Sequence, residues 1–316
     1  MELDPQVKDF LDRLAQAQLP PIQEQTVAQA RAQMNMSTQF LGSLPRVAGV
    51  ENRRIPSPGG EIRIRIIKPE GAEQGALPVL VYFHGGGWVL GNLESHEGVC
   101  RAIANAAGLI VVVADYRLAP EHAFPAAAED AHAAAAWVVA HAAEFGGDPA
   151  RVAVGGDSAG GNLAAVACLM ARDRGGPHLA FQLLIYPITD FNLHNASYRQ
   201  FAEGYFLTRG EMAWYWEHYV PKLDDRWHPH ASPCQATDKT GLPPAFVITA
   251  GFDVLRDEGE HYAGQLQAAG VHVKIRRYEG MIHSFIRRYP FFDQGKAAIE
   301  EIGRELRQAL AIHRPE

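Results

Sequence analysis

One short stretch constrains the fold of this chain more than any other, the segment Gly155-Gly156-Asp157-Ser158-Ala159-Gly160-Gly161-Asn162. It lies between a β-rich run, 151–154, and an alanine-rich run typical of a helix, 163–172. A serine at the apex of a strand-turn-helix connection is held in a strained backbone conformation that exposes its hydroxyl. The glycines two residues to either side keep Cβ atoms away from the turn. Ser158 is therefore a candidate nucleophile, and the alternative interpretation is a glycine-rich connection without chemistry.

The rest of the chain alternates between apolar runs typical of strands and longer runs typical of helices. This alternation predicts an α/β fold with a mostly parallel sheet of about eight strands, flanked by helices on both faces. The segment 61–66 alternates with a period of two and predicts a half-buried strand near a sheet edge. The other expected strands are 77–83, 109–114, 151–154, 180–186, 245–250 and 271–278, and the expected helices are 7–16, 26–34, 125–145, 163–172, 258–269 and 291–311.

One region interrupts this alternation. Between Pro187 and Pro243 no strong strand is expected, but aromatic residues are concentrated there. An aromatic insertion after a strand end can cover a pocket, although most of these rings are expected to form the insertion's own small core. We therefore expect N-terminal helices that contribute to a helical cap (1–45), a first part of a catalytic core (46–187), an aromatic cap insertion (188–240) and a second part of the core (241–316).

A serine nucleophile needs an imidazole to take its proton and a carboxylate to orient that imidazole. In doubly wound hydrolases the acid and the histidine follow the serine in the sequence, each in a loop after a strand. Asp253 and His283 occupy such positions. The competing acids are Asp190, which follows an earlier strand, and Asp257 and Glu258, which we interpret as the start of the next helix.

Acyl transfer also needs hydrogen-bond donors for the oxyanion that forms in the transition state. The backbone N–H groups of Ala159, directly after the nucleophile, and of Gly86 and Gly87, in His84-Gly85-Gly86-Gly87-Trp88, are the candidates. A flexible turn or an anion-binding nest is the alternative interpretation of the glycines. A phosphate loop is disfavoured because no Lys-Ser/Thr pair follows them.

Composition excludes several function classes. The chain has 316 residues, of which 47% are hydrophobic and 21% charged, and its net charge of −7 argues against a nucleic-acid partner. We expect no membrane span and no secretory signal, and hence a cytoplasmic location. The three cysteines, Cys100, Cys168 and Cys234, indicate neither a disulfide framework nor a zinc site, and we expect no metal.

Taken together, the motifs resemble those of the bacterial hormone-sensitive-lipase-like esterases (family IV) of the α/β-hydrolase fold. The resemblance is carried in the family's order, between residues 82 and 285, by four blocks: His84-Gly85-Gly86-Gly87-Trp88, Asp115-Tyr116-Arg117-Leu118-Ala119-Pro120-Glu121-His122, Gly156-Asp157-Ser158-Ala159-Gly160-Gly161-Asn162, and Asp253-Val254-Leu255-Arg256-Asp257-Glu258 with His283. Two positions depart from the family pattern, Ala123 in place of proline and Ser284 in place of glycine.

The resemblance implies Ser158, Asp253 and His283 as the catalytic triad, and Gly86, Gly87 and Ala159 as the oxyanion hole. It further implies a cap built from the N-terminal helices and the aromatic insertion, and no cofactor. Asp115, Arg117, Glu121 and His122 would stabilise the loop beneath the oxyanion glycines and would not react. As substrate-binding residues we expect four aromatic side chains, Trp88, Phe206, Trp214 and Phe285.

We therefore interpret the chain as a carboxylesterase that cleaves esters of short to medium acyl chain through an acyl-enzyme intermediate. An amidase or a deacetylase on the same site remains open. A non-catalytic small-molecule receptor is disfavoured because His283 is retained. The strand at 271–278 is expected at a sheet edge, where it could support a homodimer.

Overall fold

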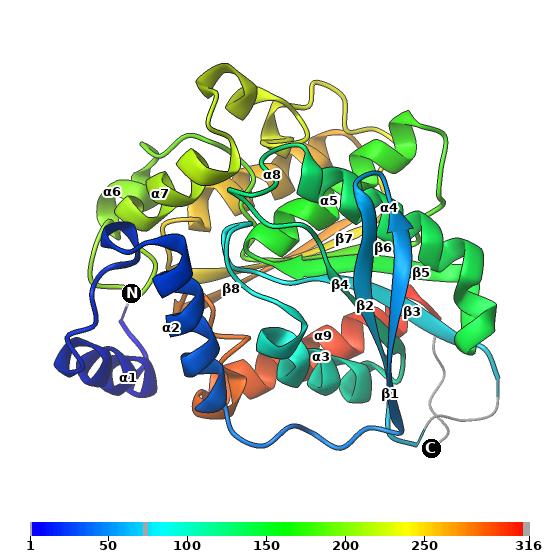
Figure 1. Ribbon diagram of the computed structural model, residues 1–316, viewed down its shortest axis with the longest axis horizontal. Helices are drawn as coiled ribbons and strands as arrows, with labels where there is room; N and C mark the ends of the chain where they lie inside the picture. Colours follow the sequence, from blue (N-terminus) through cyan, green and yellow to red (C-terminus); the bar gives the residue numbers. More distant parts are fainter. Residues whose placement is uncertain (1, 72–74, 312–316) are drawn as a thin grey trace.

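The computed structural model describes residues 2–71 and 75–311 (Figure 1). In this part of the chain eight strands form one sheet in the order β1-β2-β4-β3-β5-β6-β7-β8. The β1–β2 and β2–β4 pairs are antiparallel, and every other pair is parallel. The strands are β1 (Gly49–Ser57), β2 (Gly60–Lys68), β3 (Leu77–Phe83), β4 (Ile110–Asp115), β5 (Gly147–Asp157), β6 (Phe181–Ile185), β7 (Ala245–Phe252) and β8 (Val273–Ile282). The expected α/β architecture with a mostly parallel sheet is confirmed.

Helices cover both faces of the sheet. Figure 1 shows α3 and α9 together on one face, and α4, α5 and α8 on the other. The helices are α1 (Pro5–Gln16), α2 (Val27–Gln39), α3 (Leu93–Ala107), α4 (Ala126–His141), α5 (Ala159–Asp173), α6 (Ala196–Gln200), α7 (Arg209–Tyr219), α8 (Arg256–Ala268) and α9 (Asp293–Ala309). Because apolar side chains from both layers pack on the sheet, strands such as β3 and β7 are almost entirely buried.

Four elements were absent from the ranges predicted from the sequence, the strand β1 and the helices α3, α6 and α7. Ile55 is the one fully buried residue of β1, so the strand lacks the apolar alternation that would have indicated it. With β1 at the edge, β2 takes the second position in the sheet. The segment 61–66 therefore lies near the edge, as expected, but it does not form the edge.

The topology brings four loops together at one side of the molecule. The carboxyl ends of the parallel strands β3, β5, β7 and β8 lie on the same edge of the sheet, and each continues into a loop there. Ligands in open α/β folds bind at such an edge. The helices α1, α2 and α7 also contribute residues to a cavity at this edge.

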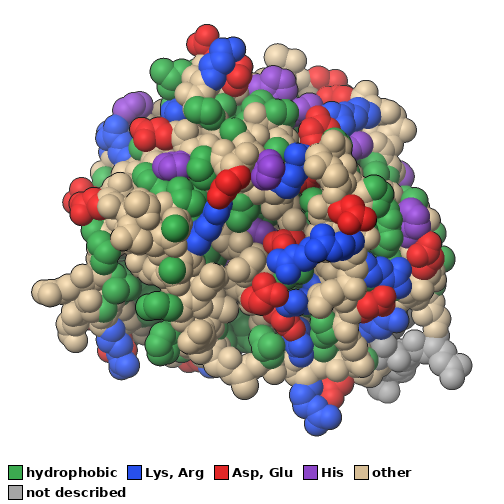
Figure 2. All heavy atoms as spheres, viewed as in Figure 1, with side chains coloured by type: hydrophobic (Ala, Val, Ile, Leu, Met, Phe, Trp, Pro, Cys, Tyr) green, Lys and Arg blue, Asp and Glu red, His purple; other side chains and the backbone are tan. Residues whose placement is uncertain are grey.

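The surface carries charges of both signs. Figure 2 shows basic and acidic side chains interspersed over this face, and hydrophobic side chains in a hollow between α1 and α2. Residues 188–244 contain no strand and bury Tyr198, Trp216 and Tyr219 completely. None of the helices in the described ranges is long and apolar enough to cross a membrane.

Candidate active site

Ser158 lies at the sharp turn between β5 and α5 and has an unusual backbone conformation. Its φ of 58° and ψ of −119° place a non-glycine residue where L-amino acids are strained by about 1–3 kcal/mol. The turn is fixed because the Ser158 N–H donates to the carbonyl oxygen of Ile185 at 2.8 Å, while the Ser158 carbonyl accepts from the N–H of Asn162. A conformation maintained at this cost is typical of a nucleophile turn.

The glycines around the serine are required by close backbone contacts. A Cβ atom on Gly160 would lie 1.9 Å from the carbonyl oxygen of Phe83, the last residue of β3. A Cβ atom on Gly156 would lie 2.4 Å from the carbonyl carbon of Gly160. Both obstacles are backbone atoms that cannot move aside without disturbing the sheet. The G-x-S-x-G spacing therefore lets α5 begin directly against β3.

His283 and Asp253 complete a hydrogen-bonded chain with Ser158. The Ser158 hydroxyl donates to Nε2 of His283 over 3.0 Å, and Nδ1–H of His283 donates to the Asp253 carboxylate over 2.7 Å. All three residues are buried, and Asp253 is also held by the N–H of Leu255 at 3.0 Å. The nucleophile, base and orienting acid thus have the geometry of a catalytic triad.

The competing acids have other partners. Asp257 accepts from the N–H of Ser197 and pairs with Arg256, and Asp190 accepts from the side chain of Gln235. Glu258 is buried beneath residues 189–190, and that burial raises its pKa. All three therefore act within the protein scaffold.

The glycine loop after β3 faces the same cavity as Ser158 and His283. Gly86 has a φ of 122°, and a Cβ atom there would lie 2.3 Å from the carbonyl oxygen of Leu90, so glycine is required. Within the described ranges the N–H groups of Gly86 and Gly87 donate no hydrogen bond. Ala159 is the first residue of α5, where a backbone N–H has no partner inside the helix.

Asp157, between the glycine and the serine of the motif, is a buried carboxylate to which the sequence assigned no role. Its carboxylate accepts from the Tyr82 hydroxyl at 2.9 Å and from the N–H of Gly85 at 3.0 Å, and it lies 3.4 Å from Nε2 of His96. Burial alone would raise the pKa of Asp157, but its contacts with His96 and Tyr82 and the charge of Arg287 hold it at about 2. The ionised carboxylate joins the nucleophile turn to the glycine loop.

A second contact supports the same loop from below. The Tyr116 hydroxyl donates to the carbonyl oxygen of His84 at 2.7 Å, and the two rings stack with centroids 4.3 Å apart. No motif in the sequence indicates this pair, although Tyr116 lies within one of the four blocks. Tyr116 follows β4 and His84 follows β3, so their contact depends on the pairing of these two strands, which the sequence does not show.

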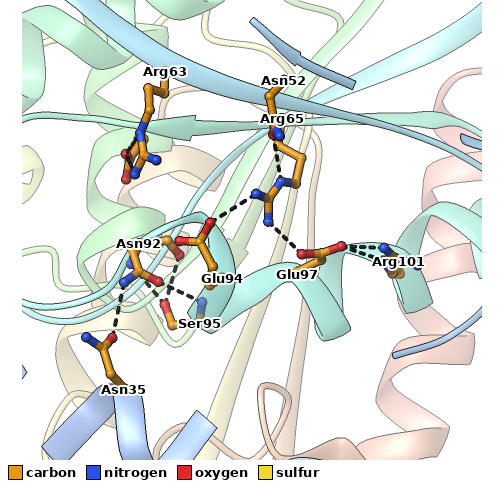
Figure 3. Close-up of polar contacts among 10 residues, drawn as sticks. Asn35, Asn52, Arg63, Arg65, Asn92, Glu94, Ser95, Glu97 and Arg101 are labelled. Carbon is orange, nitrogen blue, oxygen red and sulfur yellow. Dashed lines mark hydrogen bonds and ion pairs between the residues drawn. The ribbon is translucent and has the colours of Figure 1, made fainter. Parts of the chain in front are cut away.

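The start of α3, which carries Ser95 and His96, is fixed from two sides. Figure 3 shows Arg65 of β2 directed at Glu94 and Glu97 of α3. The side chain of Asn92 caps the helix by accepting from the N–H of Ser95 at 2.8 Å. These contacts hold His96 against Asp157.

The acidic and basic residues at the end of β4 and in the loop after it form ion pairs with other elements. Asp115 pairs with Arg63, Arg117 with Asp130, and Glu121 with Arg31 of α2. The expected stabilising function of these three residues agrees with this arrangement. His122 makes one backbone hydrogen bond, from its N–H to the carbonyl oxygen of Leu118.

A cavity of about 1270 Å³ opens beside the triad, larger than the roughly 300–1000 Å³ of most ligand pockets. Of the four aromatic residues expected to bind substrate, Phe206 lines this cavity. The other three lie outside its lining because their rings are taken up by packing. Trp88 stacks on Tyr219 with ring centroids 4.2 Å apart, while Trp214 packs on Tyr215 and His218, and Phe285 on Tyr186 and Tyr278.

A buried serine, aspartate and histidine that directly follow the carboxyl ends of β5, β7 and β8 define a serine hydrolase. Its relatives among known proteins show which class of serine hydrolase this is. Residues 80–287 match the model of a family described as having the alpha/beta hydrolase fold. The chain belongs to this α/β-hydrolase family, in its hormone-sensitive-lipase-like branch, and is a carboxylesterase.

Named relatives are similar over most of their length. The carboxylic ester hydrolase LipN of Mycobacterium tuberculosis is 43% identical over 90% of this chain and 77% of its own. The carboxylesterase NlhH of the same organism is 46% identical over 81% of each chain. The structure of the ester-hydrolase EH1AB1 from the Lake Arreo metagenome is 45% identical, with a TM-score of 0.94 over 98% of this chain and 99% of that one.

Proposed function

We propose that this enzyme hydrolyses carboxylic esters of short to medium acyl chain through an acyl-enzyme intermediate. The observation that carries the proposal is the continuous hydrogen-bonded chain from Ser158 through His283 to Asp253, open to a cavity with a largely apolar lining. The relatives described above are named as ester hydrolases, which supports the same chemistry.

In the proposed mechanism the triad residues act in a fixed order. His283 takes the proton of Ser158 as the hydroxyl oxygen attacks the ester carbonyl, and Asp253 stabilises the imidazolium that forms. The imidazolium then gives its proton to the leaving alcohol. Water repeats both steps to release the acid and restore the serine.

We assign the oxyanion hole to the N–H groups of Gly86, Gly87 and Ala159. The first two donate to no group in the described protein, and the third is the free N–H at the start of α5, directly after the nucleophile. Each such donor typically contributes about 3–4 kcal/mol to the stability of the transition state. The hydrogen bond from Gly85 to Asp157 holds the glycine loop ready to receive the charge.

We also propose that residues 1–45 and 188–240 act as a cap over the site. In support, the cavity lining includes Phe10 and Leu14 from α1, Met34 from α2, and Phe206 and Met212 from the aromatic insertion. Phe206 is then the aromatic residue of the original four that contacts substrate. The two remaining segments, 46–187 and 241–316, contribute the strands and loops of the catalytic core as far as the described residues extend.

The test is hydrolysis of para-nitrophenyl esters from acetate to palmitate, together with the matching anilides. We expect Ser158→Ala to abolish turnover, and the matched variant Ser43→Ala, at an exposed position, to behave as wild type. Activity should be greatest between acetate and octanoate. Faster cleavage of the anilides would favour an amidase, and turnover by Ser158→Ala would refute the assignment of the nucleophile.

Two further expectations remain proposals. We place the protein in the cytoplasm, in agreement with three cysteines that are each buried and free. We propose homodimer pairing through β8, which is an edge strand of the sheet. A monomeric mass in light scattering would exclude the dimer.

A further inference from the structure

Two arginines follow the catalytic histidine in the same loop and are buried beside the cavity. Arg287 and Arg288 are 4% and 8% exposed, and both line the cavity. Arg287 is well partnered, because it donates to the carbonyl oxygen of Ser95 at 3.0 Å and to the hydroxyl of Thr38 at 2.9 Å. The charge of Asp157 also acts on Arg287.

Arg288 lacks such partners. Nη1 donates to the hydroxyl of Ser284 at 2.6 Å, and this is the one hydrogen bond of its guanidinium within the described ranges. The same group lies over the ring of Phe206 at 4.2 Å and over that of Phe10 at 5.7 Å. Burial and the neighbouring Arg287 lower the pKa of Arg288 to about 9, so it still carries its charge at neutral pH.

The two residues in contact with the Arg288 guanidinium, Ser284 and Phe206, have strained backbone conformations. Ser284 has a φ of 66° and Phe206 a φ of 76°, and both lie in the left-handed region that favours glycine. Strain of this kind persists where the surrounding structure enforces it, and it is concentrated at functional sites. Here both strained residues contact one guanidinium.

The acidic side chains that line the same cavity interact with groups other than Arg288. Asp9 pairs with Arg13 at 2.9 Å, Asp157 accepts from the Gly85 N–H, and Glu211 accepts from the N–H of Thr208 at 2.8 Å. Burial raises the pKa of Glu211, which weakens it as a counter-charge. In the described part of the chain no carboxylate lies within 4.0 Å of Arg288.

We propose that Arg288 binds a carboxylate carried by the ester substrate, so that the preferred substrates are monoesters of dicarboxylic acids or acyloxy derivatives of carboxylic acids. A guanidinium with unused donors matches a carboxylate in a bidentate geometry. Ser284, its hydrogen-bond partner, directly follows His283, which places the bound anion close to the reacting ester. The inference rests on the proposed esterase function and specifies its substrate class.

Two matched substrate pairs test the inference. On the alcohol side we compare meta-acetoxybenzoate with meta-acetoxybenzamide, and on the acyl side monoethyl adipate with its terminal amide. Hydrogen bonds to charged groups correspond to about ten- to hundredfold in an equilibrium or rate constant. We expect wild type to favour the carboxylate of at least one pair by about tenfold or more in kcat/KM.

Variants assign this preference to one side chain. Arg288→Met keeps an apolar contact with Phe206 and should lower kcat/KM for the preferred carboxylate by about ten- to hundredfold, while the neutral amide changes by less than about threefold. Arg288→Lys should keep part of the preference. The matched control is Arg13→Met, since Arg13 also lines the cavity but is exposed and paired, and it should keep the wild-type preference.

Each outcome is decisive. Equal losses on the carboxylate and the amide would overturn the inference, because a purely structural Arg288 would affect both alike. Absence of any preference in wild type would also overturn it, and would leave the esterase function intact if the neutral esters are cleaved. Failure to cleave these four esters and the para-nitrophenyl esters alike would instead refute the esterase function. If Arg288→Met does not fold, competitive inhibition of wild type by hexanoate but not by hexanamide supports the inference, and equal inhibition overturns it.

Discussion

His84 directly precedes the glycine loop, and its imidazole is completely buried. Its Nδ1 contacts the Gly85 carbonyl oxygen at 2.9 Å, and its ring lies against those of Tyr116 and His96. Burial, helped by His96 and Arg287 and opposed by Asp157, lowers the pKa of His84 from 6.5 to about 3. The folded protein therefore keeps this imidazole neutral at a pH where an unfolded chain would protonate it.

This difference makes the fold sensitive to acid. Above pH 6.5 neither state binds the proton, and the stabilisation is fully present. As the pH falls from 6.5 towards 3, only the unfolded state takes up the proton, so stability is lost progressively. The whole interval corresponds to about 5 kcal/mol, of which about 2.5 kcal/mol is lost between pH 7 and pH 4.5. Burial also lowers the pKa of His96, which adds to the loss in the same direction.

The measurement is urea unfolding at several pH values between 7 and 4.5, followed by tryptophan fluorescence. The variant His84→Asn removes the titrating group and keeps a donor near the Gly85 carbonyl. Its free energy of unfolding should be lower at pH 7, because ring packing is lost. The slope of its free energy of unfolding against pH should nevertheless be about 1.4 kcal/mol per pH unit smaller than that of wild type between pH 6 and 4.5. His261→Asn, at an exposed position of α8, should keep the wild-type slope. An unchanged slope in His84→Asn would refute the buried neutral imidazole.

Three further predictions follow from the site. Asp253→Asn should lower kcat by about ten-thousandfold with an unchanged melting temperature, as steady-state kinetics and calorimetry will test, and a loss below about tenfold would contradict its orienting function. Gly160→Ala should lower the free energy of unfolding in urea by about 3 kcal/mol or more, because its Cβ would meet the Phe83 carbonyl oxygen. Its control is Gly264→Ala, in open space on α8, which should raise the free energy of unfolding by about 0.5–1 kcal/mol. Equal effects of the two would contradict the close approach. Arg31→Met removes four hydrogen bonds that connect α2 to the loops after β3 and β4. Amide hydrogen exchange in residues 27–39 should therefore be faster than in wild type. Unchanged exchange would show that other contacts hold α2.

The triad could be predicted from the sequence because the local sequence around each member indicates its position after a strand. Ser158 lies between a strand and a helix, and Asp253 and His283 each follow an apolar run. Position after a strand is a local property, and parallel topology then brings such positions to one edge. The structure places all three within hydrogen-bonding distance in the expected order.

Side-chain direction could not be predicted in the same way. Trp88 lies in the glycine loop, but a φ of 60° and the face of Tyr219 take its ring out of the cavity lining. Trp214 and Phe285 are likewise near the site in sequence and separated from the cavity by packing. Aromatic composition indicates that a region is apolar, whereas the direction of each ring depends on neighbours from distant parts of the chain.

The strand β1 and the contacts of Arg288 illustrate a second limit. β1 is defined by its nine-residue pairing with β2, since its own side chains are mostly exposed. The guanidinium of Arg288 lies over the rings of Phe10 in α1 and of Phe206 between α6 and α7, two segments that are far apart in the sequence. Strand pairing and contacts between distant segments leave no periodic hydrophobic pattern in the sequence of either segment.

Asp157 explains how the nucleophile turn and the glycine loop are kept in register. One buried carboxylate oxygen accepts both the Tyr82 hydroxyl and the Gly85 N–H, so the loop is tied to the residue adjacent to Ser158. Hydrogen bonds to an ionised acceptor are roughly twice as strong as neutral ones, and the pKa of about 2 keeps Asp157 ionised at neutral pH. Donors already aligned before charge develops in the substrate need no reorganisation during the reaction. We therefore propose that Asp157, the second residue of G-x-S-x-G, takes no proton in the mechanism and acts by positioning the N–H groups of Gly86 and Gly87 relative to the serine oxygen.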